Sequence, residues 1–208
     1  MQSSQQHQRL NSSAAIAGLG MTKMGRIYGY SPIDFAVEAV SLAIEDCGID
    51  KNGIDGLLIS GGLCSYLNMP DAVSMHLQQA LGLDDLKLVN EMNSYGATAA
   101  TMLQYAAMAC ATGQTDAVVC VFADAPLQEN PSEGYGTAIN VGTGLESLNG
   151  TSGILNAATM FAMAARRHME LYGTTSEQLA HIAVDARAWA TMNPNAQKRE
   201  PITIEDHQ

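Results

Sequence analysis

The sequence predicts an α/β fold with a mixed, mostly parallel sheet and helices layered α-β-α. Short apolar runs of strand length alternate with amphipathic helical segments along residues 14–125. The run at residues 117–123, AVVCVFA, carries no charge, as expected of a strand that is buried on both faces. The helix expected at residues 96–112 has small or apolar side chains on nearly every side, so we expect other layers to cover it.

The strands and helices of this region alternate in order. Ser31 is placed to cap a helix with Pro32 in its first turn, and Gly48 is placed to end that helix. The predicted strands are residues 14–18, 54–60, 86–90 and 117–123, and the other predicted helix is 70–81. Right-handed crossovers between successive strands would then place helices on both faces of the sheet.

Two glycine pairs need a separate interpretation. Gly18 and Gly20 follow the first predicted strand, but Lys23 stands where a dinucleotide-binding turn has its third glycine. The next helix also begins too late to point its N-terminus at a phosphate. Gly142 and Gly144 lie in a loop with no preceding strand. We interpret both pairs as ordinary turns or loops.

The remaining third of the chain is predicted to be a loop or cap region with helices. Residues 129–153 are rich in Gly, Ser, Thr and Asn, and helices are expected at 156–172 and 177–192, the second capped by Thr175 or Ser176. We therefore divide the chain into a disordered tail (residues 1–13), an α/β region (14–125) and a cap region (126–208) that is expected to stop within a domain.

Composition excludes several classes of partner. The net charge of −11 argues against nucleic acid and anionic membrane surfaces. Residues 92–115 carry no charge and are long enough to cross a bilayer. Their many Asn, Ser, Thr and Gln side chains instead favour a helix buried in protein, so we expect no membrane span.

The cysteines do not form a metal or disulfide pattern. Four widely spaced cysteines are present, with no CxxC motif and no zinc-like spacing to histidine: Cys47, Cys64, Cys110 and Cys120. We interpret them as small buried hydrophobic residues of a protein in a reducing cytoplasm, and we expect no metal site.

The candidate catalytic residues are Asn93, Ser94, Tyr95 and Gly96. They lie where a short strand runs into the small-residue helix. The N-terminus of a helix offers free N–H groups and a partial positive charge, which stabilise a thiolate or an oxyanion. Tyr95 is placed either to line a pocket or to pack.

Two segments carry a resemblance to a known family. The C-terminal segment YGTTSEQLAHIAVDARAWATMNPNAQKREPITIED (residues 172–206) and the opening AAIAGLGMTKMGR with IDGLL resemble the thiolase superfamily, in the branch of sterol carrier protein thiolases and lipid-transfer proteins. The resemblance implies five layers built from two similar halves, of which this chain is the first. It also places Asn93 where the family's Cys-x-x-Gly signature, anchored on Gly96, has its nucleophile. Asparagine cannot form an acyl-thioester.

The resemblance implies a coenzyme A thioester as substrate, with no bound cofactor. It favours aldol-type cleavage of a carbon–carbon bond in lipid or steroid side-chain metabolism, without a covalent cysteine intermediate. Two alternatives stay open: an acetyl-CoA acyltransferase (thiolase) whose nucleophile lies elsewhere, and a non-catalytic acyl-CoA- or lipid-binding or scaffold subunit. This fragment alone is expected to be inactive.

The resemblance also implies partners. We expect a homodimer in which the strand at 117–123 pairs across a twofold axis, and a small companion protein with an OB-fold and a zinc ribbon. Arg166, Arg167 and His168, with other cations nearby, would contact the phosphates of coenzyme A, although a solvated helix face explains this local positive charge equally well.

Overall fold

The computed structural model describes residues 14–60, 73–125, 127, 129, 144, 146–154 and 157–207. The chain divides into two compact units, one of Met1–Thr22 and Ile27–Tyr135 and the other of Lys23–Arg26 and Gly136–Gln208. The predicted tail at 1–13, Cys64, Gly142 and most of the predicted excursion at 129–153 lie outside the described residues.

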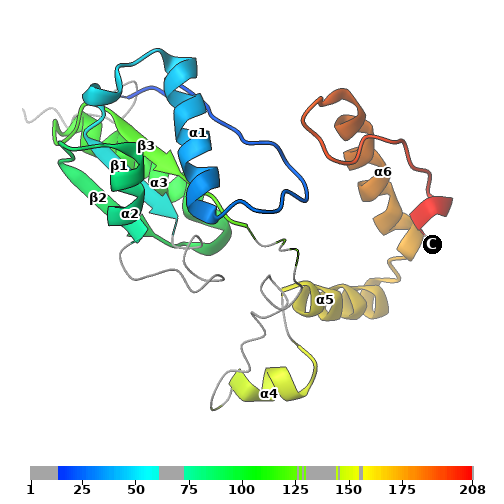
Figure 1. Ribbon diagram of the computed structural model, residues 1–208. Helices are drawn as coiled ribbons and strands as arrows, with labels where there is room; N and C mark the ends of the chain where they lie inside the picture. Colours follow the sequence, from blue (N-terminus) through cyan, green and yellow to red (C-terminus); the bar gives the residue numbers. More distant parts are fainter. Residues whose placement is uncertain are drawn as a thin grey trace, which may run out of the picture. The chain divides into compact units, whose positions relative to one another are not determined.

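The first unit is a three-layer α-β-α arrangement (Figure 1). In the described residues its sheet has three parallel strands in the order β2-β1-β3, with Leu58 opposite both Asn90 and Cys120. The strands are β1 (Gly56–Ser60), β2 (Leu88–Met92) and β3 (Val118–Val121). Helices α1 (Pro32–Cys47) and α2 (Val73–Leu81) cover one face, and α3 (Thr98–Ala111) covers the other. The predicted fold class is confirmed.

The central strand β1 contributes side chains to the core on both faces of the sheet. Leu57 and Ile59 pack among the apolar residues of α1 and α2, whereas Leu58 packs among those of α3, and none of the three is exposed to solvent. This alternation follows from the two-residue period of a strand. Each fully buried side chain of this size contributes about 1.5–3 kcal/mol, so this strand anchors both layers.

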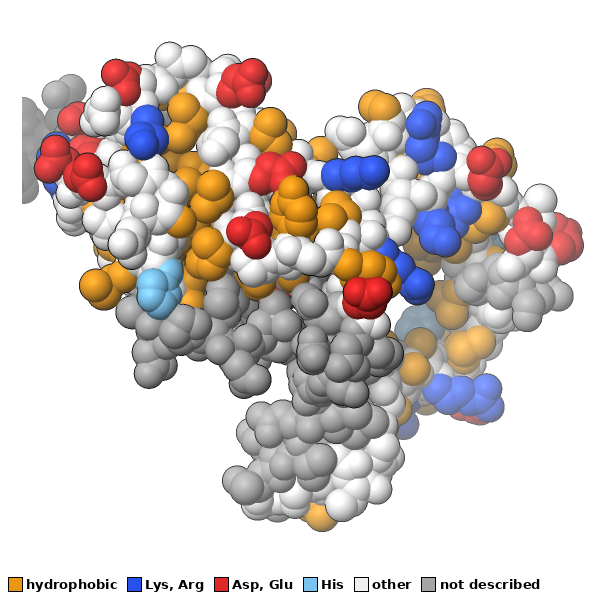
Figure 2. All heavy atoms as spheres, in the orientation of Figure 1, with side chains coloured by type: hydrophobic (Ala, Val, Ile, Leu, Met, Phe, Trp, Pro, Cys, Tyr) orange, Lys and Arg blue, Asp and Glu red, His pale blue; other side chains and the backbone are white. Residues whose placement is uncertain are grey.

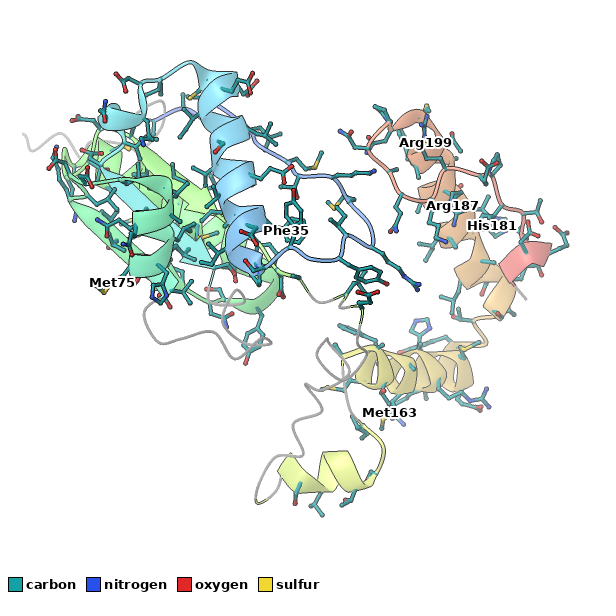
Figure 3. The ribbon with its side chains drawn as sticks, in the orientation of Figure 1. Phe35, Met75, Met163, His181, Arg187 and Arg199 are labelled. Carbon is teal, nitrogen blue, oxygen red and sulfur yellow. The ribbon has the colours of Figure 1, made fainter. Side chains whose placement is uncertain are left out.

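Helix α1 begins and ends where the sequence predicts. Ser31 Oγ accepts a hydrogen bond from the Asp34 N–H (3.2 Å), and the Asp34 carboxylate accepts one from the Ser31 N–H (2.8 Å), which completes a capping box. Gly48 ends the helix with a φ of 66°, a conformation that favours glycine. Phe35 of the first turn (Figure 3) pairs with Tyr30, and their ring centroids are 5.1 Å apart.

The predicted strand at residues 14–18 is wrong, because these residues are described and form no strand. The Gly18–Gly20 segment is not a simple turn either. A Cβ on Gly20 would collide with the Ala39 carbonyl oxygen, and one on Gly18 would collide with that of Ala43. The two glycines therefore let the segment lie directly on the backbone of α1, where the Leu19 N–H donates to Asp46 Oδ2 (2.9 Å).

We expect Gly20→Ala to lower the free energy of unfolding by about 1–3 kcal/mol, because the new methyl group displaces helix backbone rather than a flexible side chain. Gly53→Ala is the matched control, since its Cβ would meet only the Ile49 side chain, at 3.6 Å. Urea unfolding of both variants measures the difference. Equal stability of the two would show that the segment does not pack tightly on α1.

Helix α3 is covered on one side by this chain. Thr98, Met102 and Ala109 face the sheet and are buried, whereas Leu103 and Met108 are 44% and 43% exposed. The outer side carries no charged residue. Of the complete cover predicted for this helix, the described residues of the first unit supply the sheet side alone.

A buried carboxylate, which the sequence analysis did not identify, joins the starts of all three strands. The Asp55 carboxylate accepts hydrogen bonds from the N–H groups of Asp116 (2.9 Å) and Ala117 (3.0 Å) and pairs with Lys87 Nζ at 2.8 Å. Burial acts to raise the pKa of Asp55, but the bonds from Lys87 and from the two N–H groups outweigh it, so the pKa lies below its usual value. This network holds the strand starts in register.

The second unit is helical, with α4 (Glu146–Thr151), α5 (Ala157–Tyr172) and α6 (Ser176–Met192). Thr175, one of the two predicted caps, is the N-cap of α6, and it forms a capping box with Gln178. Two arginines tie the C-terminal segment to α6: Arg187 Nη1 donates to the Glu200 carbonyl (2.7 Å), and Arg199 Nη2 donates to that of Thr191 (3.2 Å) (Figure 3).

The surfaces of the described parts are rich in apolar side chains. Figure 2 shows hydrophobic side chains gathered among scattered acidic ones on the visible face of the first unit. In the second unit, Phe161 and Trp189 are 75% and 73% exposed. Among the described helices, none has the length and apolar character needed to cross a bilayer.

Candidate functional site

The candidate site lies at the carboxyl edge of the parallel sheet. The chain leaves β1 toward α2 on one face, whereas it leaves the neighbouring β2 toward α3 on the other face. Connections that diverge in this way open a crevice at the carboxyl ends of the two strands, which is where open α/β sheets bind ligands. Asn93 to Gly96 follow β2 directly, so the topology places them at this edge.

A tight turn joins β2 to α3. Asn93 Oδ1 accepts a hydrogen bond from the Tyr95 N–H (3.0 Å). Thr98 Oγ1 accepts one from the Ser94 N–H (2.9 Å) and donates to the Tyr95 carbonyl (2.7 Å). The turn is therefore closed by side chains from both of its ends.

Tyr95 occupies a strained backbone conformation. Its φ is 51°, and it is the one residue other than glycine with a positive φ in the described chain. Non-glycine residues in this region cost about 1–3 kcal/mol each and cluster at functional sites. The Tyr95 side chain is 91% exposed, so it does not pack against the described residues.

The helix begins later than the sequence predicts. Residues Tyr95–Ala97 form a 3₁₀ turn and the α-helix starts at Thr98, not at Gly96. The N–H groups of Ser94 and Tyr95 are used inside the turn and are not free for a ligand. A Cβ on Gly96 would meet nothing within 4 Å among the described residues, so none of them crowds that position.

The described cysteines lack the properties of a nucleophile. Cys47, Cys110 and Cys120 are free and partly buried. Burial, with a smaller contribution from Cys110, raises the pKa of Cys120 to about 11, so this thiol stays protonated at neutral pH. Among the described residues, no base is hydrogen-bonded to the Ser94 hydroxyl, so Ser94 has no partner that would activate it.

Asp124 is a further candidate that sequence reasoning missed. It follows β3 and therefore lies at the same carboxyl edge as Asn93, with β1 between their strands. Burial raises its pKa above the usual value, and the Ala125 N–H donates to it at 2.8 Å. A carboxyl with a raised pKa at a ligand-binding edge is a candidate general base. An acidic residue directly after an apolar strand was the available sequence signal.

The predicted phosphate contacts lie on α5. Arg166 Nη2 pairs with Glu170 at 2.7 Å, one turn along the helix, and both side chains are exposed. His168 Nδ1 lies 3.0 Å from Thr174 Oγ1, and its ring lies 4.7 Å from that of Tyr172. Arg167 is exposed and has no partner among the described residues.

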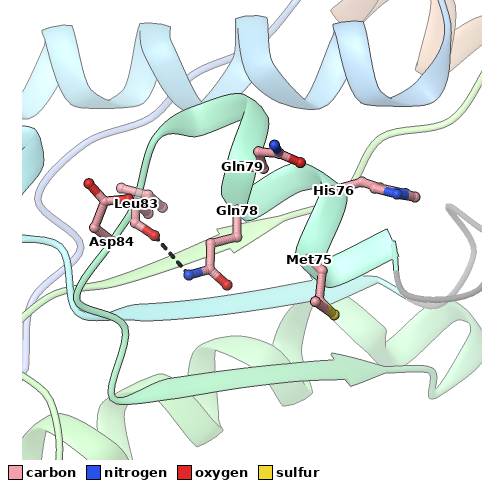
Figure 4. Close-up of a pocket in the computed structure, with 6 residues that line it drawn as sticks. All are labelled: Met75, His76, Gln78, Gln79, Leu83 and Asp84. Carbon is pink, nitrogen blue, oxygen red and sulfur yellow. Dashed lines mark hydrogen bonds between the residues drawn. The ribbon is translucent and has the colours of Figure 1, made fainter.

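A surface hollow of about 480 Å³ lies along α2 and the turn after it (Figure 4). Gln78 Nε2 donates to the Leu83 carbonyl (2.9 Å) at its wall. None of the predicted site residues lines it. In the described ranges, no group of three His, Cys, Asp or Glu side chains is placed to hold a metal ion.

Known proteins resemble this chain in sequence and fold. No protein-family model matches it. It is 34% identical over 208 residues to a steroid side-chain-cleaving aldolase of Thermomonospora curvata, a match covering 96% of this chain and 50% of that protein. It is 33% identical to the 17-hydroxy-3-oxo-4-pregnene-20-carboxyl-CoA lyase of Mycobacterium tuberculosis, covering 96% and 51%.

A solved structure is similar to this chain in both sequence and fold. The Ltp2-ChsH2(DUF35) aldolase superposes with a TM-score of 0.74 at 33% identity, covering 93% of this chain and 48% of that one. The chain is thus similar in sequence and fold to thiolase-like aldolases, and its relatives include a non-specific lipid-transfer protein-like protein of Caenorhabditis elegans (28% identical) and the sterol carrier protein 2 of Gallus gallus (26% identical). This thiolase-like chain spans about half the length of the curated relatives it matches.

Proposed function

We propose that this thiolase-like chain is part of an enzyme that cleaves a carbon–carbon bond of a β-hydroxyacyl-CoA by a retro-aldol reaction. The observation that carries the proposal is Asn93 at the turn after β2, the position that the resemblance assigns to the family's nucleophilic cysteine. The names of the two relatives, an aldolase and a lyase, support the same reaction class and a steroid side chain as the substrate class.

The reaction needs no covalent intermediate. A base removes the proton of the β-hydroxyl group, the Cα–Cβ bond breaks, and its electron pair passes into the thioester as an enolate. Protonation of Cα then gives a shortened acyl-CoA and a ketone or aldehyde. The Asn93 amide would donate a hydrogen bond to the enolate oxygen, and the carboxylate of Asp124 is placed to act as a base.

The test is an incubation of the full-length protein with a steroid β-hydroxyacyl-CoA. The proposal expects a steroid ketone and a shortened acyl-CoA in equal amounts, both detected by mass spectrometry. Tight binding of the substrate without any product would instead favour the non-catalytic carrier or scaffold subunit.

We expect iodoacetamide to leave this cleavage unchanged, because the proposed chemistry uses no thiolate and the Cys120 thiol is held protonated. The rate of cleavage before and after alkylation is the measurement, and a cysteine-dependent thiolase treated in parallel is the control. Inactivation at the rate of the control enzyme would favour the acyltransferase alternative.

We also propose that Arg167 contacts the phosphates of coenzyme A. Arg167 is available because it is exposed and unpaired among the described residues. Arg166 and His168 would assist, since the exposed Arg166–Glu170 pair contributes little and can exchange for a phosphate.

We propose two protein partners. Strand β3 is an edge strand of the described sheet with an uncharged sequence, and the adjacent Phe122 is 61% exposed. Edges of this kind favour pairing with another chain, here a second copy. The similar solved structure carries the name ChsH2(DUF35) beside Ltp2, which supports a companion protein. An OB-fold with a zinc ribbon is the fold that we propose for this companion.

A further inference from the structure

We infer that Thr98 is a positioning residue for this site: its buried hydroxyl group holds the turn from Asn93 to Tyr95 in the shape that the reaction uses. The inference rests on the proposed function. Thr98 would not touch the substrate itself, but would act through the residues that do.

Thr98 combines burial with two hydrogen bonds to the turn. It is only 4% exposed, on the side of α3 that packs against the sheet. Its Oγ1 accepts from the Ser94 N–H at 2.9 Å and donates to the Tyr95 carbonyl at 2.7 Å. A hydroxyl group can accept and donate at the same time, and only Thr or Ser offers this on so short a side chain. The buried hydroxyl therefore fixes the backbone on both sides of the Ser94–Tyr95 peptide.

The turn requires such support because Tyr95 is in a left-handed conformation. A residue with a side chain keeps that conformation only where surrounding contacts hold it. The described side-chain contacts that do so are the two bonds of Thr98 Oγ1 and the bond from the Tyr95 N–H to Asn93 Oδ1. Two backbone bonds, from the Thr98 N–H to the Tyr95 carbonyl and from the Ala97 N–H to the Ser94 carbonyl, support the same turn. Release of Tyr95 would therefore also release the Asn93 side chain, which is the proposed hydrogen-bond donor.

Thr101 provides a matched comparison on the same helix. Its Oγ1 donates to the carbonyl of Ala97, the N-cap residue of α3, at 2.6 Å, and makes no bond to the turn from Asn93 to Tyr95. Removal of the Thr101 hydroxyl takes away one hydrogen bond of similar length without touching the conformation of Tyr95. A comparison of substitutions at Thr98 and Thr101 therefore separates an effect on the position of the site residues from an effect on the stability of α3.

The experiment compares Thr98→Val, Thr98→Ser and Thr101→Val in the full-length protein, with kcat and KM for β-hydroxyacyl-CoA cleavage and a melting temperature for each. We expect Thr98→Val to lower kcat about 10- to 100-fold, because small misplacements of catalytic groups have effects of this size. KM should change less than about threefold, since the contacts that bind the substrate remain. Thr98→Ser should restore most of kcat, and Thr101→Val should match the wild type.

Distinct outcomes separate the role of Thr98 from the proposed function. A wild-type protein that cleaves no β-hydroxyacyl-CoA overturns the proposed function and the inference with it. An active wild type, with kcat unchanged in Thr98→Val or lowered equally in Thr101→Val, overturns the role of Thr98 alone. If Thr98→Val does not fold, Thr98→Ala replaces it, and the Ala-to-Ser comparison decides in the same way.

Discussion

Asn93→Asp is expected to lower kcat for β-hydroxyacyl-CoA cleavage about 100- to 1,000-fold, the effect typical of losing one oxyanion hydrogen-bond donor. The aspartate keeps an oxygen that can accept the Tyr95 N–H, so the turn stays closed. It loses the amide N–H group and places a negative charge where the enolate would develop. Steady-state kinetics of the full-length variant measure the effect.

Asn90→Asp is the matched control for this substitution. Asn90 is exposed on β2, three residues before Asn93, and the same change adds the same charge close to the site but not in the turn. We expect its kcat to stay within about twofold of the wild type, because an exposed charge is largely screened. A loss shared equally by both variants would mean that added charge, and not the Asn93 amide, explains the effect.

Asp55→Ala is expected to lower the free energy of unfolding by about 2–3 kcal/mol or more. The change removes the acceptor of the Asp116 and Ala117 N–H groups, and hydrogen bonds to a charged group contribute about 1.5–3 kcal/mol each. It also removes the ion pair with Lys87. Denaturant unfolding at about pH 7, where the carboxylate is ionised, measures the loss.

The same network gives a pH dependence. The pKa of Asp55 is lower in the folded protein than in the unfolded chain, where it is about 3.9. Its contribution to stability is therefore fully present above that unfolded value and is lost as the pH falls through the lower native pKa. Unfolding curves of the wild type and Asp55→Ala should converge in this acidic range.

Lys87→Ala is the control for Asp55. The Lys87 side chain is 57% exposed, so its loss should cost no more than about 1 kcal/mol. If Lys87→Ala lowered the free energy of unfolding as much as Asp55→Ala, the ion pair and not the backbone bonds would hold the strand starts together.

Local signals predicted most of the fold correctly. The Ser31 cap, the left-handed Gly48 and the Thr175 cap each depend on residues within one helix turn, and the sequence shows them directly. The sequence predicts strand β1 because a short apolar run between turn residues is typical of a buried strand. These features do not depend on distant partners.

Features that depend on distant contacts were missed or misread. Gly18 and Gly20 look like a turn in the sequence, and only the approach of α1 shows that they are packing positions. In the sequence Asp55 looks like any other acidic residue. Only the folded structure shows that Lys87 and the N–H groups of Asp116 and Ala117 contact its carboxylate.

The candidate site was placed by the sequence at the end of β2, but its geometry was not predictable. The left-handed Tyr95 and the later start of α3 follow from bonds that Asn93 and Thr98 make across the turn. Asn93 is a residue type that favours such turns, but the sequence does not show that Thr98 closes the turn from its other end. The role of Asn93 itself was inferred from the resemblance to a family.

The most direct measurement of the central claim is the requirement for free coenzyme A during cleavage by the full-length protein. A retro-aldol reaction divides one β-hydroxyacyl-CoA into a carbonyl compound and one acyl-CoA. We therefore expect full activity without added coenzyme A and no consumption of free thiol. Cleavage of a β-ketoacyl-CoA that depends on added coenzyme A and consumes one thiol per turnover would contradict it.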